Sequence, residues 1–412
     1  MNLFYHLGLW LYRLIARLIS PFSAKANLFT QGHNGLISKI CDQIDHKKPI
    51  VWIHCASLGE FEQGRPIIER YRMKEPNHQI LLTFFSPSGY EIKKGDSIAD
   101  RIFYFPLDTR RNVRRFLDNV QPIKAIFIKY EFWYNYLIAL KKRKIPTYIV
   151  SATFRSSQPF FKWYGAFFRR MLHTFTLIFV QNEASKTLLN QIDFKNVVVA
   201  GDTRFDRVWT QAQLPCSLPI VESFLQASNN EVCVAGSTWP HDESLLYQAL
   251  LEHKQLKLIL VPHEVDPPHI AAIMAQFAPF SPIQYSLSSN LNTFPNNSQV
   301  LVIDTIGLLS SLYRFGSIAY LGGGFKDGIH NILEAAVYGV PIIFGPNYKK
   351  FNEAVDLVRM GGAISIQKSQ ELNTQMGLWL TSPQVCADAG RICRGYVEKH
   401  IGATEIVLGR IC

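Results

Sequence analysis

A carboxylate stands at the start of a predicted helix in the segment HCASLGEFEQGRP, residues 54–66. The segment directly follows the apolar run PIVWI, and Ala56, Ser57 and Gly59 are small enough to allow a tight turn from a strand into a helix. Glu60 then falls in or near the first helical turn, where it is a candidate general base that removes a proton from an attacking hydroxyl. The alternative is a carboxylate that only serves the helix dipole.

Two further charged residues follow apolar runs in the same half of the chain. Glu131 lies in KYEFWYN, residues 129–135, and Arg204 lies in AGDTRFDRV, residues 200–208. Two acidic residues at the ends of parallel strands can converge on one pocket, which makes Glu131 a possible partner of Glu60. The planar guanidinium of Arg204 suits recognition of phosphate or carboxylate, although an ion pair with Asp202 or Asp206 is an equally good interpretation.

A glycine-rich turn marks the second half, in AYLGGGFKDGIHNILEAAVYGVPIIFGPN, residues 319–347. We expect a strand, a loop and then a helix that begins near His330-Asn331 and carries Glu334 in its first turns. Glycines let the backbone approach a ligand, and the N–H groups at a helix start attract phosphate, while Glu334 can accept hydrogen bonds from a ribose diol. The alternative is a turn whose glycines serve close packing only.

Two supporting segments also follow apolar runs in the second half and so could line the same nucleotide pocket. LVPHEV contains Pro262 and His263, and VIDTIGLLSSLY contains Asp304 to Leu308. A histidine such as His263 is more commonly a satisfied loop residue than a ligand contact.

The elements that must position these residues are two series of short apolar runs separated by helical stretches. The first series extends from PIVWIHCAS to TLIFVQN, and the second from EVCVAGST to VPIIFGP. Such alternation indicates βαβ units and a parallel sheet covered on both faces. The polar stretch near residues 205–230 separates the series, so we predict two doubly wound domains that bind ligands beyond the carboxyl ends of their strands.

The charge is uneven along the 412 residues. Residues 1–200 hold 29 Lys and Arg against 14 Asp and Glu, whereas residues 201–412 hold 14 against 18. The first half is therefore suited to an anionic partner, such as an acidic membrane surface, a phosphorylated lipid or nucleic acid. Solvated helix faces are the alternative interpretation.

The N-terminal segment MNLFYHLGLWLYRLIARLISPF is strongly apolar but contains Arg13 and Arg17. Its uninterrupted apolar part is too short to span a bilayer, and no cleavage site follows it. At helical spacing the two arginines share one face, while Leu7, Trp10 and Leu14 lie largely on the other. We predict a helix that lies in the membrane interface, with a helix packed on the domain core as the alternative.

Seven scattered cysteines without a CxxC pair argue against a disulfide framework and against a zinc site, and favour a reducing compartment. Cys55 and Cys233 lie inside apolar runs and are expected to be buried.

Taken together and in this order, a set of segments resembles the Kdo transferases of lipopolysaccharide synthesis: ASLGE, FFSPSGYE, YFPLD, EFWYN, SATF, QNEAS, GDTRFD, AGSTWPHDE and HNILEAA. The resemblance covers essentially the whole chain. It implies the GT-B architecture, with two Rossmann-like domains that face each other across a cleft. The implied division is a membrane-associating helix over residues 1–22, an acceptor-binding domain over residues 23–208 and a CMP-sugar-binding domain over residues 209–412, whose last helices can pack back on the first domain.

The resemblance also implies roles for individual residues. Glu60 becomes the proton acceptor, and Glu131 and Arg204 are associated with stabilisation of the transition state. The contacts to CMP fall on Pro262, His263, Ile306, Gly307, Leu308, Asn331, Ile332, Leu333 and Glu334. The chain departs from the family where Lys129-Tyr130 precede Glu131 and where Arg204 replaces a common lysine.

The implied reaction is inverting transfer of Kdo, an acidic eight-carbon sugar, from CMP-Kdo to lipid A precursor (lipid IVA). We expect no cofactor, and no metal ion because no Asp-x-Asp pair follows a strand of the second domain. The expected partners are the donor, the lipid acceptor and an anionic membrane surface, at the cytoplasmic face of the inner membrane.

Two other functions remain open at this point. A GT-B transferase that uses a UDP-sugar, such as a lipid A disaccharide synthase, shares the sheet pattern and the membrane association. A basic nucleic-acid-binding protein would need aromatic residues interleaved with its Lys and Arg clusters. The clusters at residues 110–115 and 141–144 lie mostly on helical stretches without such interleaving, so we expect no nucleic acid partner.

Overall fold

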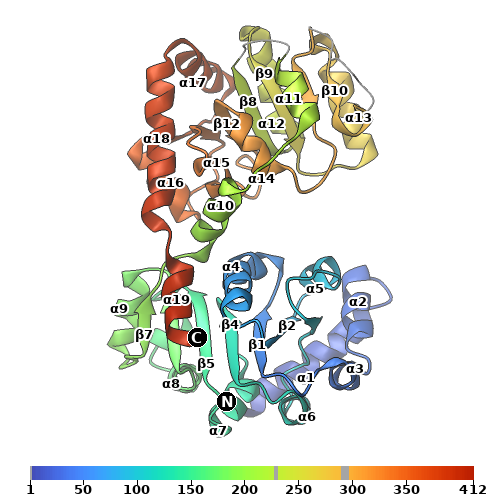
Figure 1. The fold of residues 1–412 in the computed structure, drawn as a ribbon, viewed down its shortest axis with the longest axis vertical. Coiled ribbons are helices and arrows are strands. Elements are labelled where there is room, and N and C mark those ends of the chain that lie inside the picture. Colours follow the sequence, from blue (N-terminus) through green and yellow to red (C-terminus); the bar gives the residue numbers. More distant parts are fainter. Residues whose placement is uncertain (1, 227–230, 289–296) are drawn as a thin grey trace. The chain divides into compact units, whose positions relative to one another are not determined.

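The computed structural model describes residues 2–226, 231–288 and 297–412, without the side chains of Asn2 and Leu3. The chain divides into two compact units, Met1–Arg207 with Ile401–Cys412, and Val208–His400. It therefore passes from one unit to the other twice, within helix α10 (Thr203–Gln213) and after helix α18 (Pro383–His400). In Figure 1 each unit is a sheet with helices packed around it.

The first unit is built on a seven-stranded parallel sheet of order β3-β2-β1-β4-β5-β6-β7. Every residue of β1, β2 and β5 is buried, because helices cover both faces of the sheet. The strands are β1 (Ile50–Cys55), β2 (Gln79–Phe84), β3 (Arg101–Tyr104), β4 (Lys124–Ile128), β5 (Thr147–Ala152), β6 (Leu177–Val180) and β7 (Val197–Val199).

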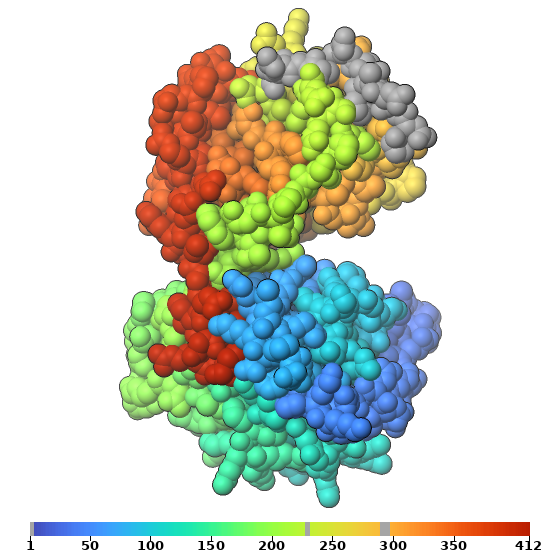
Figure 2. Space-filling view, viewed as in Figure 1, coloured from blue at the N-terminus to red at the C-terminus, as the bar shows by residue number. Residues whose placement is uncertain are grey.

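The helices of the first unit come from both ends of the chain. Those before and between the strands are α1 (Asn2–Ile19), α2 (Ala24–Gly32), α3 (Leu36–Gln43), α4 (Leu58–Lys74), α5 (Pro87–Lys93), α6 (Arg110–Val120), α7 (Tyr134–Lys142), α8 (Ala166–Leu172), α9 (Glu183–Gln191) and the start of α10. Helix α19 (Ala403–Ile411) returns to this unit and packs against α4, where Figure 2 shows its red atoms beside the blue atoms of α4.

The second unit repeats the architecture with the order β10-β11-β9-β8-β12-β13-β14. Its strands are β8 (Val232–Thr238), β9 (Lys257–Pro262), β10 (Ile283–Gln284), β11 (Val300–Val302), β12 (Ile318–Leu321), β13 (Ile342–Phe344) and β14 (Ala363–Ser365). Its helices are α11 (Pro219–Gln226), α12 (Pro240–Glu252), α13 (Pro267–Gln276), α14 (Leu309–Leu312), α15 (Leu333–Ala336), α16 (Asn352–Met360), α17 (Ser369–Thr381) and α18.

The predicted apolar runs form strands in both units, and both sheets are parallel as expected. The pattern of apolar runs does not predict β10 and β14, which are two and three residues long and lie at the two edges of the second sheet. Edge strands of this length contain too few apolar residues to produce a recognisable run.

Helix α1 packs on the first unit with one side, as in the alternative interpretation, and leaves its other side open. Tyr5 packs against Tyr134 and Phe167 of the first unit, so one side of the helix is attached to the domain. The opposite side is apolar and open, with Trp10 60% and Leu18 65% exposed. Within the described ranges, the helices are all too short or too polar to cross a bilayer.

Candidate active site

Glu60 lies in the first turn of α4, directly beyond the carboxyl end of β1. Its side chain is half-buried and not part of the packed interior. Ser57, the residue that precedes the helix, donates a hydrogen bond from its Oγ to Oε2 of Glu60. The carboxylate is therefore held at the mouth of the sheet with its other oxygen available to accept a proton.

Glu131 lies beyond the carboxyl end of β4, the neighbour of β1 in the sheet. Only 8% of the residue is exposed. Oε2 accepts hydrogen bonds from Nε2 of His54, at 3.0 Å, and from Nε1 of Trp133, at 2.6 Å. Two donors on one oxygen fix the carboxylate and leave Oε1 for a ligand.

His54 is fully buried and can donate to Glu131 in either protonation state. Its Nδ1 lies 3.0 Å from both the carbonyl oxygen and the hydroxyl oxygen of Thr83. A neutral ring can accept from the hydroxyl at Nδ1 and donate from Nε2, whereas a protonated ring can donate to the carbonyl from Nδ1. The orientation of Glu131 is thus independent of a proton on His54.

The electrostatics of Cys55 indicate that the two carboxylates share one region. Cys55 is the last residue of β1, and its thiol is fully buried. Burial raises its pKa well above the ordinary value, and the charges of Glu60 and Glu131 raise it further. Both carboxylates are therefore close enough to the Cys55 thiol to raise its pKa. The prediction that Cys55 and Cys233 are buried is confirmed.

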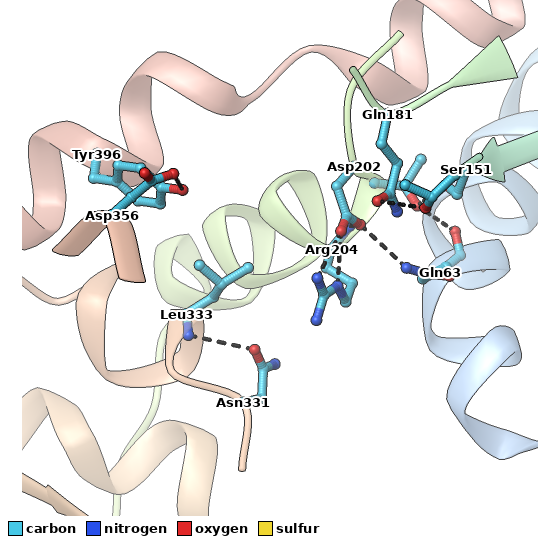
Figure 3. A network of polar contacts seen from close by, with 11 residues as sticks. Gln63, Ser151, Gln181, Asp202, Arg204, Asn331, Leu333, Asp356 and Tyr396 are labelled. Atoms are coloured by element: carbon cyan, nitrogen blue, oxygen red, sulfur yellow. Dashed lines mark hydrogen bonds and ion pairs between the residues drawn. The ribbon is translucent and has the colours of Figure 1, made fainter. Parts of the chain in front are cut away.

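Arg204 forms the ion pair with Asp202 that the sequence analysis kept as an alternative. Figure 3 shows Asp202 between Arg204 and Gln63. The guanidinium donates to Oδ2 of Asp202 from its Nε, at 2.9 Å, and from one terminal nitrogen, at 2.7 Å. Asp206 instead accepts the backbone N–H groups of Gly402 and Thr404 at the start of α19.

The start of α10 is tied to α4, which brings Arg204 towards Glu60 although β7 lies at the edge of the sheet. The hydroxyl of Thr203 donates to the carbonyl of Gln63, at 2.5 Å, and lies 3.1 Å from the hydroxyl of Ser151. Gln63 belongs to the turn of α4 that follows Glu60. Glu60, Glu131 and Arg204 are therefore all held at the same end of the first sheet.

The second unit has an aromatic stack beyond the ends of β8 and β9. His263 lies between Trp239 and His330, with centroid separations of 4.6 Å on both sides. Lys326 places its Nζ 3.4 Å from the centroid of Trp239. A cavity of about 570 Å³ adjoins this stack and is lined by residues that include His241, Phe325 and Lys326.

The glycine turn has a packing explanation. A Cβ at Gly322 would lie 2.2 Å from the carbonyl oxygen of Ser237, and one at Gly324 would lie 2.5 Å from the backbone nitrogen of Gly345. Gly323 has a φ of +83°, and its N–H donates to the buried carboxylate of Asp242 at 3.0 Å. The alternative interpretation, glycines for close backbone packing, accounts for these contacts.

The helix expected to begin near His330-Asn331 is shorter and starts later, since α15 covers Leu333–Ala336. The side chain of Asn331 takes the place of the missing helical turn. Its Oδ1 accepts the N–H of Leu333 at 3.3 Å, as Figure 3 shows. Its Nδ2 donates to Glu334 at 3.1 Å. Only the side chains of Asn331 and Glu334 are partly open here, whereas Ile332 and Leu333 are buried.

The remaining predicted donor contacts lie on loops that leave the same end of the second sheet. Pro262 closes β9 and is buried, and His263 is exposed. Ile306 is 88% exposed, Gly307 has a φ of +97°, and Leu308 directly precedes α14. In the part of the chain that the structure describes, no cluster of His, Cys, Asp or Glu side chains could hold a metal ion.

The family comparison matches the unit that contains the two carboxylates. Residues 32–207 match the model of the 3-deoxy-D-manno-octulosonic-acid transferase (Kdo transferase) family. Residues 32–207 therefore form a domain of the Kdo transferase family. Two curated Kdo transferases illustrate the relation. The one from Aquifex aeolicus is 28% identical over 81% of this chain and 87% of its own length, and the one from Haemophilus influenzae is 28% identical over 78% and 76%.

Solved structures show that the chain has the GT-B fold. A glycosyltransferase from Rickettsia africae covers 88% of this chain with a TM-score of 0.56 at 13% identity. MurG from Acinetobacter baumannii covers 87% with a TM-score of 0.53 at 12% identity. The predicted fold class is confirmed in its two parallel-sheet units, and the similarity to curated Kdo transferases supports a glycosyltransferase.

Several residues of this site are not predicted by the sequence. His54 lies within the quoted HCASLGE segment, but as part of a strand it reads as a core residue. Trp133 is a local partner, two residues after Glu131, whereas Trp239 and Lys326 become site residues through contacts with residues distant in sequence. A polar residue inside a strictly apolar strand is the one signal that could have identified His54.

Proposed function

We propose that this chain is an inverting glycosyltransferase that transfers Kdo from CMP-Kdo to lipid A precursor, at the cytoplasmic face of the inner membrane. The observation that carries the proposal is the division of labour between two carboxylates at the carboxyl ends of β1 and β4. Glu60 is accessible and held by Ser57, and Glu131 is nearly buried and held by His54 and Trp133. One is suited to take up a proton and the other to remain a fixed negative charge.

In the proposed reaction Glu60 removes the proton of an acceptor hydroxyl while the oxygen attacks the anomeric carbon of Kdo. The bond to the CMP phosphate breaks on the opposite face, so the configuration inverts. Glu131 would stabilise the positive charge that grows on the sugar ring, and Arg204 would act on the developing phosphate charge. Residues 262–263, 306–308 and 331–334 would hold CMP. The step balances without a cofactor or a metal ion.

The lipid acceptor is supported by the charge and surface of the first unit. Residues 1–200 carry 29 Lys and Arg against 14 Asp and Glu, and α1 exposes an apolar face. An anionic lipid substrate and an anionic membrane surface both match this combination.

The test is mass spectrometry of the lipid product formed from CMP-Kdo and a tetraacylated lipid A precursor. We expect a mass increase of one or more Kdo units, and inhibition by CMP rather than by UDP. A precursor that stays unmodified, or activity with a UDP-sugar that UDP inhibits, would contradict the proposed donor while leaving the fold assignment intact.

A further inference from the structure

Two hollows adjoin each other in the first unit, where α1, α2 and α3 lie beside one another and α6 packs on α3 (Figure 1). One is a cavity of about 170 Å³, and the other is a groove of about 250 Å³. Phe29 lines the groove and His33 lines the cavity, and their rings are 4.1 Å apart between centroids. This ring pair is therefore the wall between the hollows. Neither hollow contains a residue assigned to sugar transfer.

The cavity is cationic. Arg13 of α1 and Arg115 of α6 both line it, and none of its lining residues is acidic. Over the described ranges neither guanidinium has an ion-pair partner, whereas the adjacent Arg114 pairs with Asp118. Two guanidinium groups that converge on a hollow without a carboxylate favour a bound anion with several oxygens, such as phosphate.

The start of α3 contributes to the same cavity. Gly35, Leu36, Ile37 and Ser38 line it, and no side chain caps this end of the helix. The N–H groups of a helix start carry a partial positive charge and suit an anion. Gly35 has a φ of +64°, a conformation that glycine adopts without strain. These donors add to the two arginines that define the cavity.

The groove is lined mainly by apolar side chains, with Ser23 and Lys25 also in its wall. Tyr12, Ile15, Ala16 and Ile19 form its α1 side, and Phe29 of α2 lines it as well. The exposed Leu14 and Leu18 belong to the same helix. An acyl chain gains about 0.8 kcal/mol for each CH₂ group that leaves water, so such a groove favours an alkyl ligand.

We propose that the two hollows together bind a membrane phospholipid with a small phosphate head group. The phosphate lies between Arg13 and Arg115 at the start of α3, and an acyl chain lies in the groove on the other side of the Phe29–His33 wall. The cavity is smaller than the pockets of roughly 300–1,000 Å³ that hold drug-sized ligands. It therefore fits a phosphate head group better than a phosphorylated disaccharide. The proposal does not depend on the sugar-transfer reaction.

A matched pair of double variants tests the cationic half. R13Q/R115Q removes the two cavity arginines, and R17Q/R114Q removes one arginine from each of the same helices without touching the cavity. The probes are phosphatidylcholine vesicles with and without phosphatidic acid. Each lost charge weakens general attraction by about 1 kcal/mol in both variants. We expect R13Q/R115Q to bind the phosphatidic acid vesicles about tenfold more weakly than R17Q/R114Q, a difference of about 1.4 kcal/mol.

Equal binding by the two double variants would overturn the site and leave only diffuse electrostatics. All four arginines are exposed, so circular dichroism and thermal unfolding should match those of the unmodified chain.

Soluble probes test the apolar half by calorimetry. The unmodified chain should bind dihexanoyl phosphatidic acid more tightly than glycerol 3-phosphate or inorganic phosphate. Ala16→Phe fills the groove, so it should lower the affinity for dihexanoyl phosphatidic acid to that for glycerol 3-phosphate. The binding of glycerol 3-phosphate itself should be preserved. Equal affinities of the unmodified chain for the three probes would overturn the lipid assignment. Displacement of dihexanoyl phosphatidic acid by a water-soluble phosphorylated glucosamine disaccharide at comparable concentration would overturn the choice of a phospholipid.

Discussion

At Glu60, the removal of a proton can be tested separately from the binding of the sugar donor. It is a half-buried side chain that accepts a hydrogen bond from the hydroxyl of Ser57. Glu60→Gln keeps the size and the hydrogen bond but removes the proton acceptor. We expect transfer to fall by about 10²–10⁴-fold while CMP-Kdo binding changes little. Single-turnover assays and donor-binding calorimetry measure the two quantities.

The matched control is Glu69→Gln, the same change on the exposed surface of α4, where Glu69 pairs with Arg65. It should leave turnover unchanged. Near-normal turnover in Glu60→Gln would exclude Glu60 as the base.

His54 is expected to act on the reaction through Glu131. In His54→Phe the carboxylate keeps only the donor from Trp133, and a nearly buried carboxylate that loses a hydrogen bond is destabilised by about 1–3 kcal/mol or more. We predict a lower kcat and a lower Tm. His54→Gln, which can still donate, should recover part of both. Equal kinetics for the Phe and Gln variants would contradict a positioning role.

At the scale of single residues, the sequence predicted the types and chain positions of Glu60, Glu131 and Arg204 but not their partners. Motif spacing locates a side chain at the end of a strand, because the strand and the turn are local. The donor from His54 comes from β1, and this pairing depends on which strands are neighbours in the sheet, whereas the donor from Trp133 is only two residues along the chain. The ion pair of Arg204 was predictable as an alternative, since Asp202 is local.

Among the elements, α1 is attached to the core through a buried carboxyl group. The hydroxyl of Tyr5 donates to Asp108 at 2.5 Å, and the same carboxyl accepts the N–H groups of Asn135 and Tyr136 at the start of α7. Burial raises the pKa of Asp108 to about 7, although these hydrogen bonds act in the opposite direction. The loop after Glu131 and the N-terminal helix therefore meet at one titratable group.

This carboxyl should make the stability of the first unit depend on pH. Its folded pKa of about 7 is above the ordinary value of 3.8, so between these values the folded state holds a proton that the unfolded state has lost. The stability that Asp108 contributes is thus present below about pH 4 and is lost as the pH rises through 7. Urea unfolding gives the free energy of unfolding of the unmodified chain and of Asp108→Asn. The difference between the two free energies should decrease by about 4 kcal/mol from pH 4 to pH 8.

A pH-independent difference between these two proteins would contradict the assignment. Tyr5→Phe is the companion variant, because it removes the contact from α1 but keeps the carboxyl, and it should retain the pH dependence.

The open face of α1 supplies a prediction about membranes. Leu7 and Leu18 are 56% and 65% exposed, so replacing both with Glu should leave thermal unfolding unchanged. Vesicle binding should fall, because the variant loses two apolar contacts and adds two negative charges near an anionic surface. Vesicle co-sedimentation checks this, and unchanged binding would place the membrane contact elsewhere.

At this scale the sequence predicted strands and helices well where a long apolar run or a clear period marked them. It predicted too early a start for α15, because the side chain of Asn331 takes the place of a helical turn. For the glycine turn, only the close approach of Gly322 and Gly324 to other backbone segments distinguishes packing from ligand binding.

For the whole molecule, α19 makes the first unit discontinuous in sequence. Val407, Leu408 and Ile411 are buried against this unit, and Glu405 pairs with Lys74 of α4. Leu408→Ser should therefore destabilise the first unit by roughly 3 kcal/mol or more, while Ile406→Ser, at a position that is 44% exposed, should have little effect. In calorimetry only the transition of the first unit should move. A shift confined to the second unit would contradict this.

The same arrangement has a consequence for biosynthesis. Domains tend to fold as they leave the ribosome, in the order of their synthesis. Here α19 can cover the surface of α4 only after residues 208–400 have been synthesised. The second unit can therefore complete its folding first, although it is encoded later. A nascent chain stalled before residue 401 would carry an unfinished hydrophobic surface on its older half, and chaperones that recognise such surfaces would meet this protein at that stage.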